Sequence, residues 1–380
     1  MAIRVGVKVY SYAWFYRWGH DEYSAAQWLR DHGIDFVIGL NRFVPMADNA
    51  VLSAQTGGTA RRDPPSDERW ADALRAQGIE YWAACNVFFD PAALQRFPDA
   101  IPMDKCGRRA EQIDWYLGAC PTHVGYLESK TQQIAAAARA LKPDGIHLGF
   151  IRFPGFWELR VPAIPAAHHP EYCFCPRCCA RFAIDTGRTI PAEFTDAPWQ
   201  WAASPEVYPA YSTWKAQVIA AAVEHIRDAV RYEVGSVPVM LNTLPFFPDE
   251  EDGALRNAYG QHWEILAPSV DVFEVMTYHQ ILDRPTSWIG DMVRCVRNRV
   301  SQSVAATIQV SPLYLEGMHA GHARNPRLDP AEFRMALEEA SFAGADRVVL
   351  FTWDDLLNAD DVEVSRKLEM LVRVSEGRGS

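Results

Sequence analysis

Apolar, β-rich segments alternate along the whole chain with segments that have helical periodicity. The expected strands are Val5–Tyr10, Phe36–Leu40, Tyr81–Phe88, Gly145–Phe153, Val237–Leu244, Val270–Tyr278, Ala305–Val310 and Arg347–Thr352. The expected helices are Tyr23–His32, Asp67–Gln77, Ser129–Leu141, Tyr211–Tyr232, Thr286–Arg299, Pro330–Ala343 and Val362–Val372. Strands that alternate with helices form right-handed βαβ units and a parallel sheet. Because eight strands recur, the sequence predicts an α/β fold of the (β/α)8 TIM-barrel type.

The length and internal organisation of the chain fit one such barrel. A chain of 380 residues lies within the range of α/β barrels that carry loop insertions. Residues 154–209 are rich in Pro, His, Cys and Trp and lack long periodicity. We therefore expect a single barrel domain over residues 1–380, with residues 154–209 forming an inserted, Cys-containing βα loop after the fourth strand. Loops at this end of a barrel lie over the active site.

The charge of the chain limits its partners. The formal net charge is −11 and no block of Lys or Arg stands out, so electrostatics disfavours nucleic acid as a partner. No apolar run approaches membrane-spanning length, and the start of the chain lacks the features of a signal peptide. We expect a cytoplasmic protein with a small-molecule ligand and no membrane partner. Self-association into a homo-oligomer stays open.

Polar and aromatic side chains follow the expected strands at their C-terminal ends. Catalysis in this fold requires such groups to converge from several strands. Each residue by itself could equally be a satisfied structural polar group. The candidates for holding a substrate are Tyr10, Asn86, Arg152, Trp157, Asn242, Tyr278, His279 and Trp353.

Glu274 is the sharpest single position, because it lies within a strand and has apolar neighbours on both sides. Burying an unpaired carboxylate costs several kcal/mol, so Glu274 must be paired, protonated or functional. We expect a catalytic role, and the alternative is a structural ion pair with Arg152 or another inward-facing base. Asp354 and Asp355 follow the last strand, where Asp can also cap a helix. Glu158 is a loop carboxylate that either overhangs the pocket or faces solvent.

Four of the eight Cys residues lie within seven positions, in Cys173-Phe-Cys-Pro-Arg-Cys-Cys179. Such clustering in a sizeable chain indicates metal ligation more than a disulfide framework. The spacing fits tetrahedral zinc, with Cys173, Cys175 and Cys178 as ligands and Cys179, Cys120 or a His as the fourth. We take Cys179 as the expected fourth ligand. Free thiols or one disulfide are the alternatives, and a structural zinc would stabilise a loop with little core of its own.

The chain resembles a glycoside-hydrolase-like (β/α)8 barrel family whose fourth strand reads approximately Asp-Gly-Ile-His-Leu-Asp-Tyr-Ile-Arg-Tyr-Pro. The matching residues are Asp144-Gly-Ile-His-Leu148, Ile151-Arg152 and Pro154. Similarity extends to Ala119-Cys-Pro-Thr122, to Cys173-Phe-Cys-Pro-Arg-Cys178 and to Met276-Thr-Tyr-His279. The resemblance implies a carbohydrate-active barrel with its site at the C-terminal ends of the strands.

Gly149 departs from this pattern, because the family has a strand-four Asp at that position. Glycoside hydrolysis usually needs two carboxylates that flank the scissile bond. Our leading hypothesis is a glycosidase that uses Glu274 with Asp354, Asp355 or Glu158, acts on an oligosaccharide or glycoside and needs no catalytic cofactor. The alternative is a barrel that binds sugar without cleaving it. A metal-dependent hydrolase or isomerase is disfavoured because no HxH pair follows a strand.

Overall fold

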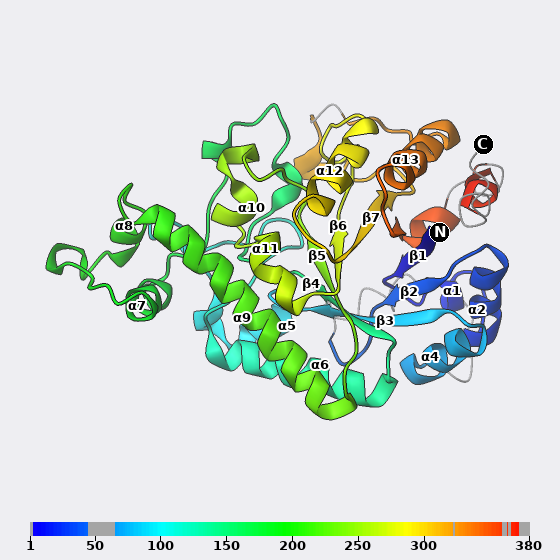
Figure 1. Cartoon of the computed structure of the whole chain (residues 1–380), viewed down its shortest axis with the longest axis horizontal. Helices are drawn as coiled ribbons and strands as arrows, with labels where there is room; N and C mark the ends of the chain where they lie inside the picture. Colours follow the sequence, from blue (N-terminus) through cyan, green and yellow to red (C-terminus); the bar gives the residue numbers. More distant parts are fainter. Residues whose placement is uncertain (1–2, 45–64, 322–323, 359–362, 364–365, 372–380) are drawn as a thin grey trace.

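The computed structural model describes residues 3–44, 65–321, 324–358, 363 and 366–371. Its centre is a closed parallel barrel in which neighbouring strands follow the order of the chain (Figure 1). The strands are β1 (Arg4–Val9), β2 (Phe36–Gly39), β3 (Glu80–Asn86), β4 (Gly145–Gly149), β5 (Val239–Thr243), β6 (Val272–Val275), β7 (Ser303–Gln309) and β8 (Arg347–Phe351). Barrel closure through the β1–β8 pairing confirms the predicted TIM barrel.

Helices occupy the connections between the strands, as the periodicity predicts. The longer ones are α2 (Glu22–Asp31), α4 (Asp67–Ala76), α6 (Val124–Leu141), α9 (Tyr208–Val234), α12 (Ser287–Arg297) and α13 (Pro330–Phe342). Several begin where a side chain accepts a hydrogen bond from a free backbone N–H, as Asp21, Ser66 and Asp329 do at α2, α4 and α13. The expected helix Val362–Val372 lies partly outside the described residues.

The interior of the barrel is apolar at one level and polar at the next. Side chains alternate between the two faces of a strand, so Gly6 and Lys8 of β1 share one face, and Tyr10, just after β1, continues the same alternation. Phe36, Trp82 and Met240 belong to an apolar cluster that includes residues of β2, β3, β5, β6, β7 and β8. The cavity described below lies towards the C-terminal ends of the strands.

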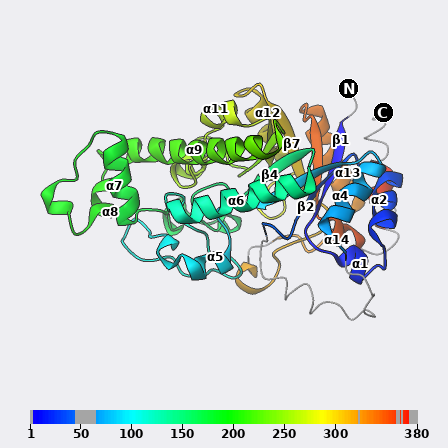
Figure 2. The same cartoon turned by 90° about the horizontal axis from the view of Figure 1, so that it is seen from below.

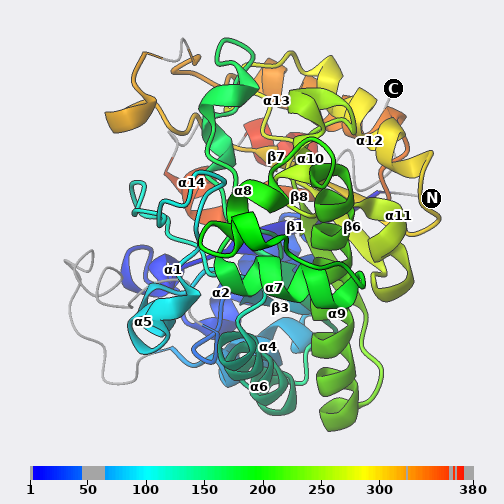
Figure 3. The same cartoon turned by 90° about the vertical axis from the view of Figure 1, so that its left-hand side faces the viewer.

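The segment between β4 and α9 contains most of the predicted insertion over residues 154–209, whose last two residues already belong to α9. This segment contains the ten-residue helix α7 (Pro176–Asp185), the shorter helix α8 (Pro198–Ala202) and several 3-10 segments, and it leads into α9. Figures 1 and 2 both place α7 and α8 beyond the barrel, at the N-terminal end of the long helix α9. In Figure 3 they lie in front of the strands, and α6 runs beside α9. Among the described residues, no helix combines the length and apolar character needed to cross a membrane.

Candidate active site

A cavity of about 260 Å³ lies among the C-terminal ends of the strands and the loops that follow them. Its lining is predominantly aromatic, and a few polar groups converge in it. This is the usual composition of a small-molecule site. The lining residues are Lys8, Tyr10, Trp115, Phe150, Arg152, Trp157, Glu158, Asn242, Met276, Tyr278, Tyr314 and Phe351.

The cavity brings together about half of the residues that the sequence singles out. The predicted site residues in its lining are Tyr10, Arg152, Trp157, Glu158, Asn242 and Tyr278. The predicted residues that are not in this lining are Asn86, Glu274, His279, Trp353, Asp354 and Asp355.

Glu158 is a carboxylate in the lining, and it belongs to the short 3-10 helix Trp157–Leu159 on the loop after β4. Burial leaves Glu158 only 6% exposed and raises the pKa of its carboxyl to about 7, although Arg152 and Arg324 pull in the opposite direction. The backbone carbonyl of Glu158 accepts a hydrogen bond of 2.6 Å from Nη2 of Arg324. A carboxyl with this pKa is protonated in a large fraction of molecules at neutral pH, as a general acid must be.

Glu274 lies within the barrel, with 0% of its surface exposed, and it is enclosed by polar side chains. Its Oε1 lies 2.8 Å from Nζ of Lys8, and its Oε2 lies 2.7 Å from Nε2 of His147. Asn242 Nδ2 donates to Oε2 at 2.5 Å, and the hydroxyl of Thr307 donates to Oε1. The structure therefore contains the ion pair that we considered as the alternative for Glu274, with Lys8 and not Arg152 as the base.

The charges of this buried group follow from its contacts. Burial alone would raise the pKa of Glu274, but Lys8 and the hydrogen bond from His147 outweigh burial and hold that pKa below its usual range. Burial lowers the pKa of His147, so its imidazole is neutral and donates from Nε2. Burial also opposes the charge on Lys8, yet Glu274 raises the net pKa of Lys8. Since Lys8 and Asn242 line the cavity, Glu274 lies behind them and fixes both.

The acidic residues after β8 have local structural contacts. Asp355 forms a capping box with Thr352 at the start of α14 (Trp353–Leu357). Asp355 therefore has the helix-capping contact that was the alternative to a catalytic role. Asp354 accepts a hydrogen bond from the hydroxyl of Ser11, and burial raises the pKa of Asp354.

The other predicted residues outside the lining also have protein neighbours. Trp353 stacks on Trp70, with ring centroids 6.5 Å apart. Nε2 of His279 lies 3.0 Å from a carboxylate oxygen of Glu332. Asn86 Oδ1 would lie 3.1 Å from a Cβ at Gly149, so the space beside Gly149 adjoins Asn86. Glu274 contacts His147, which lies two residues before Gly149 on β4.

Six lining residues were not selected from the sequence: Lys8, Trp115, Phe150, Met276, Tyr314 and Phe351. Lys8 carried a detectable signal, because it is a charged residue within the apolar strand Arg-Val-Gly-Val-Lys-Val. Trp115 and Tyr314 come from loops after β3 and β7, and their sequence surroundings carry no comparable signal.

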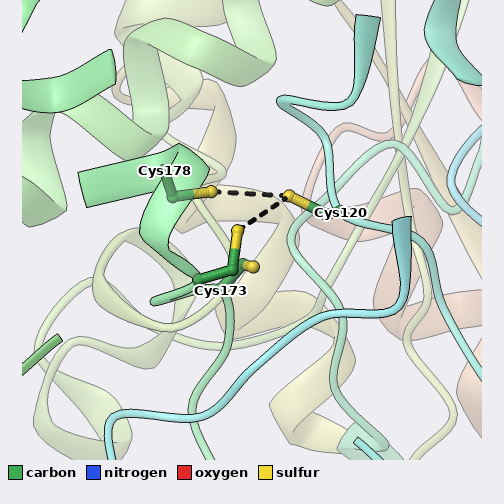
Figure 4. Close-up of side chains that lie close together, drawn as sticks. Cys120, Cys173 and Cys178 are labelled. Atoms are coloured by element: carbon green, nitrogen blue, oxygen red, sulfur yellow. Dashed lines mark hydrogen bonds between the residues drawn. The ribbon is translucent and has the colours of Figure 1, made fainter. Parts of the chain in front are cut away.

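A second cluster of reactive side chains consists of Cys120, Cys173, Cys175 and Cys178, all of which are buried. Their sulfur atoms lie within 4.8 Å of one another. The Sγ of Cys120 is 3.4 Å from that of Cys178 and 3.9 Å from that of Cys175. Figure 4 shows Cys120 facing Cys178 from a different segment of the chain. These four residues could bind a metal ion.

Cys120, not Cys179, completes this group of four. Cys179 points elsewhere and donates to the carbonyl of Phe174 at 3.4 Å. Successive residues at the start of α7 face different directions, so Cys178 and Cys179 cannot both turn towards the cluster. Cys120 reaches the cluster from the segment before α6, and we had left it open as an alternative fourth ligand.

Comparisons with solved structures identify similar folds. No protein-family model matches the chain, and no curated protein is significantly similar to it in sequence. The glycoside hydrolase domain of PgaB (BpsB) from Bordetella bronchiseptica is 15% identical with a TM-score of 0.65, and the match covers 97% of this chain and 99% of that domain.

β-Galactosidases have similar structures as well. Those from Bacillus circulans sp. alkalophilus and Marinomonas ef1 are 15% and 14% identical, with TM-scores of 0.68 and 0.67. Each match covers 99% of this chain but only 56% and 60% of the respective enzyme. At these identities the comparisons show the fold alone: the chain has the (β/α)8 barrel fold found in these glycoside hydrolases.

Proposed function

We propose that this protein is a glycoside hydrolase that binds a carbohydrate in the cavity at the C-terminal ends of the barrel strands. The observation that carries the proposal is the position of Glu158, a cavity carboxyl whose pKa is raised by burial to about 7. In this role Glu158 donates a proton to the leaving oxygen of the glycosidic bond, water supplies the oxygen that replaces it at the anomeric carbon, and a proton from that water restores Glu158.

The rest of the lining supports a sugar as the ligand. Trp157 and Trp115 offer aromatic faces, and Tyr10, Asn242 and Lys8 offer polar groups for hydroxyls. One N–H of the Asn242 side-chain amide donates to Glu274, so its other N–H and its oxygen remain for a ligand hydroxyl. The similar barrels include a glycoside hydrolase domain and β-galactosidases, which act on sugars.

In this proposal Glu274 is not a catalytic residue, although its position in the sequence suggests a catalytic role. Its carboxylate is buried behind Lys8 and Asn242 and pairs with Lys8. We assign it as a positioning residue that holds these two side chains in the cavity.

A second candidate function is sugar binding without cleavage. Two-carboxylate hydrolysis needs a second acid, and Glu158 is the only carboxylate among the described residues that line the cavity. Asp354 and Asp355, which we considered as partners, are engaged by Ser11 and by the start of α14.

Turnover and binding measured together separate the two candidates. The test assays a panel of disaccharides and methyl glycosides, whose leaving alkoxides need a proton, for hydrolysis, and measures the binding of the same methyl glycosides. We expect hydrolysis that Glu158→Gln abolishes while sugar binding persists. The matched control is Glu193→Gln, which changes an exposed carboxylate on the same insertion. Binding without turnover in the parent protein would support the second candidate, and neither binding nor turnover across the panel would refute both.

We also propose that Cys120, Cys173, Cys175 and Cys178 bind a structural zinc ion. Tetrahedral zinc with Zn–S bonds of about 2.3 Å places its sulfur ligands about 3.8 Å apart. The sulfur separations of 3.4 and 3.9 Å are close to that value. The ion would join the segment before α6 to the insertion that carries Glu158.

A further inference from the structure

Arg152 is a cavity residue whose guanidinium has no hydrogen-bond or ion-pair partner among the described residues. It is 3% exposed and lines the same cavity as Glu158. Its side chain makes no hydrogen bond to a described residue and no ion pair within 4.0 Å, and its Nε is buried without a partner. A guanidinium N–H that is buried without an acceptor is costly, because it has lost its water.

Aromatic rings hold this guanidinium in place without neutralising it. Its Cζ lies 5.0 Å from the centre of the Phe150 ring and 6.0 Å from the centre of the Tyr116 ring. Contact with an aromatic face fixes the plane of a guanidinium and leaves its N–H edge free for a planar acceptor. Arg152 is thereby preorganised for bidentate contact with a carboxylate.

The surroundings of the cavity do not supply the missing negative charge. Lys8 and Glu274 compensate each other at 2.8 Å. Arg324 adds a second cation and donates to the backbone carbonyls of Glu158, Ile281 and Tyr314 at 2.6, 2.9 and 2.9 Å. Arg152 lowers the pKa of Glu158, but burial raises that pKa to about 7, so Glu158 carries only part of a negative charge near neutral pH. Position 149, at the end of β4 and three residues before Arg152, is a glycine and therefore contributes no carboxylate. The cavity therefore has an excess of positive charge, although the whole chain has a net charge of −11.

We propose that the cavity is specific for an acidic sugar, and that Arg152 binds the carboxylate of a uronic acid. This inference rests on the proposed carbohydrate-binding function and adds the substrate class. The ligand carboxylate satisfies the N–H groups of Arg152, and the aromatic residues contact the sugar ring. Glu158 lies in the same cavity, so one bound sugar can contact both residues.

The test compares matched ligands that differ at the acidic group. Binding of methyl β-D-glucuronide, methyl β-D-glucoside and glucose 6-phosphate is measured by calorimetry, together with the corresponding galacto ligands. We expect the preferred uronide to bind about ten- to a hundredfold more tightly than its neutral counterpart, as a charge-assisted hydrogen-bond pair provides. Arg152→Met should remove this preference, so that the uronide binds no more tightly than its neutral counterpart.

Arg152→Lys provides a second variant that keeps the charge but loses the planar fork, and it should retain only part of the preference. Uronides that bind no more tightly than neutral sugars would overturn the inference and leave the proposed function intact. So would a preference that survives in Arg152→Met, or tighter binding of the sugar phosphate than of the uronide. If no sugar of either kind binds, the proposed function fails as well.

Discussion

The buried pair between Lys8 and Glu274 makes a quantitative prediction about stability. Two unit charges 2.8 Å apart attract by about 6 kcal/mol at an effective dielectric constant of about 20. Removing one partner of a buried pair typically costs about 3–5 kcal/mol, because the other charge is left uncompensated. Lys8→Met and Glu274→Gln should each lower the free energy of unfolding by roughly that amount. The double variant should lose much less than the sum of the two.

Urea denaturation of the parent, the two single variants and the double variant measures this coupling. The control is the same cycle on Arg139 and Glu233, whose side chains are 65% and 26% exposed and whose pair should contribute about 0–1 kcal/mol. The pKa of Glu274 is lowered in the folded state, so its contribution is present above the ordinary pKa and is lost as the pH falls below it. Additive effects of Lys8→Met and Glu274→Gln, within about 0.5 kcal/mol, would refute the inferred ion pair.

Three further predictions concern other parts of the site. The raised pKa of Glu158 means that the folded state binds its proton more tightly than the unfolded state, so stability should fall by about 3 kcal/mol as the pH rises from about 4.5 to 7. Denaturation across this range should show that Glu158→Gln removes that part of the slope, and an unchanged slope would contradict the assignment. Cys120→Ser should reduce bound zinc from about one equivalent to well below it in elemental analysis, whereas Cys179→Ser should retain it; equal zinc in both variants would exclude Cys120 as a ligand. Arg324→Met leaves three backbone carbonyls without their donor and should cost at least about 2 kcal/mol in urea denaturation. The exposed Arg327→Met is its control, and equal losses in the two variants would argue against this role.

The sequence by itself determined the barrel and much of one side of the cavity. Period-two and helical patterns are local, and eight alternating units leave few topologies other than a closed parallel barrel. Arg152, Trp157 and Glu158 lie within seven positions after a single strand, so their arrival at one end of the barrel follows from that strand alone. The same holds for Cys173, Cys175 and Cys178, whose short spacing keeps their sulfurs close.

Tertiary structure decided which distant residues complete each group. The apolar neighbours of Glu274 indicate that its carboxylate is buried, but its contact with His147 joins positions 127 residues apart, and Lys8 comes from the first strand. Likewise, Cys120 approaches Cys178 from 58 residues away, and only the direction of each side chain at the start of α7 selects Cys178 over Cys179. Periodicity fixes the face that a residue occupies, whereas barrel closure and side-chain rotamers determine which residue from another strand meets it there.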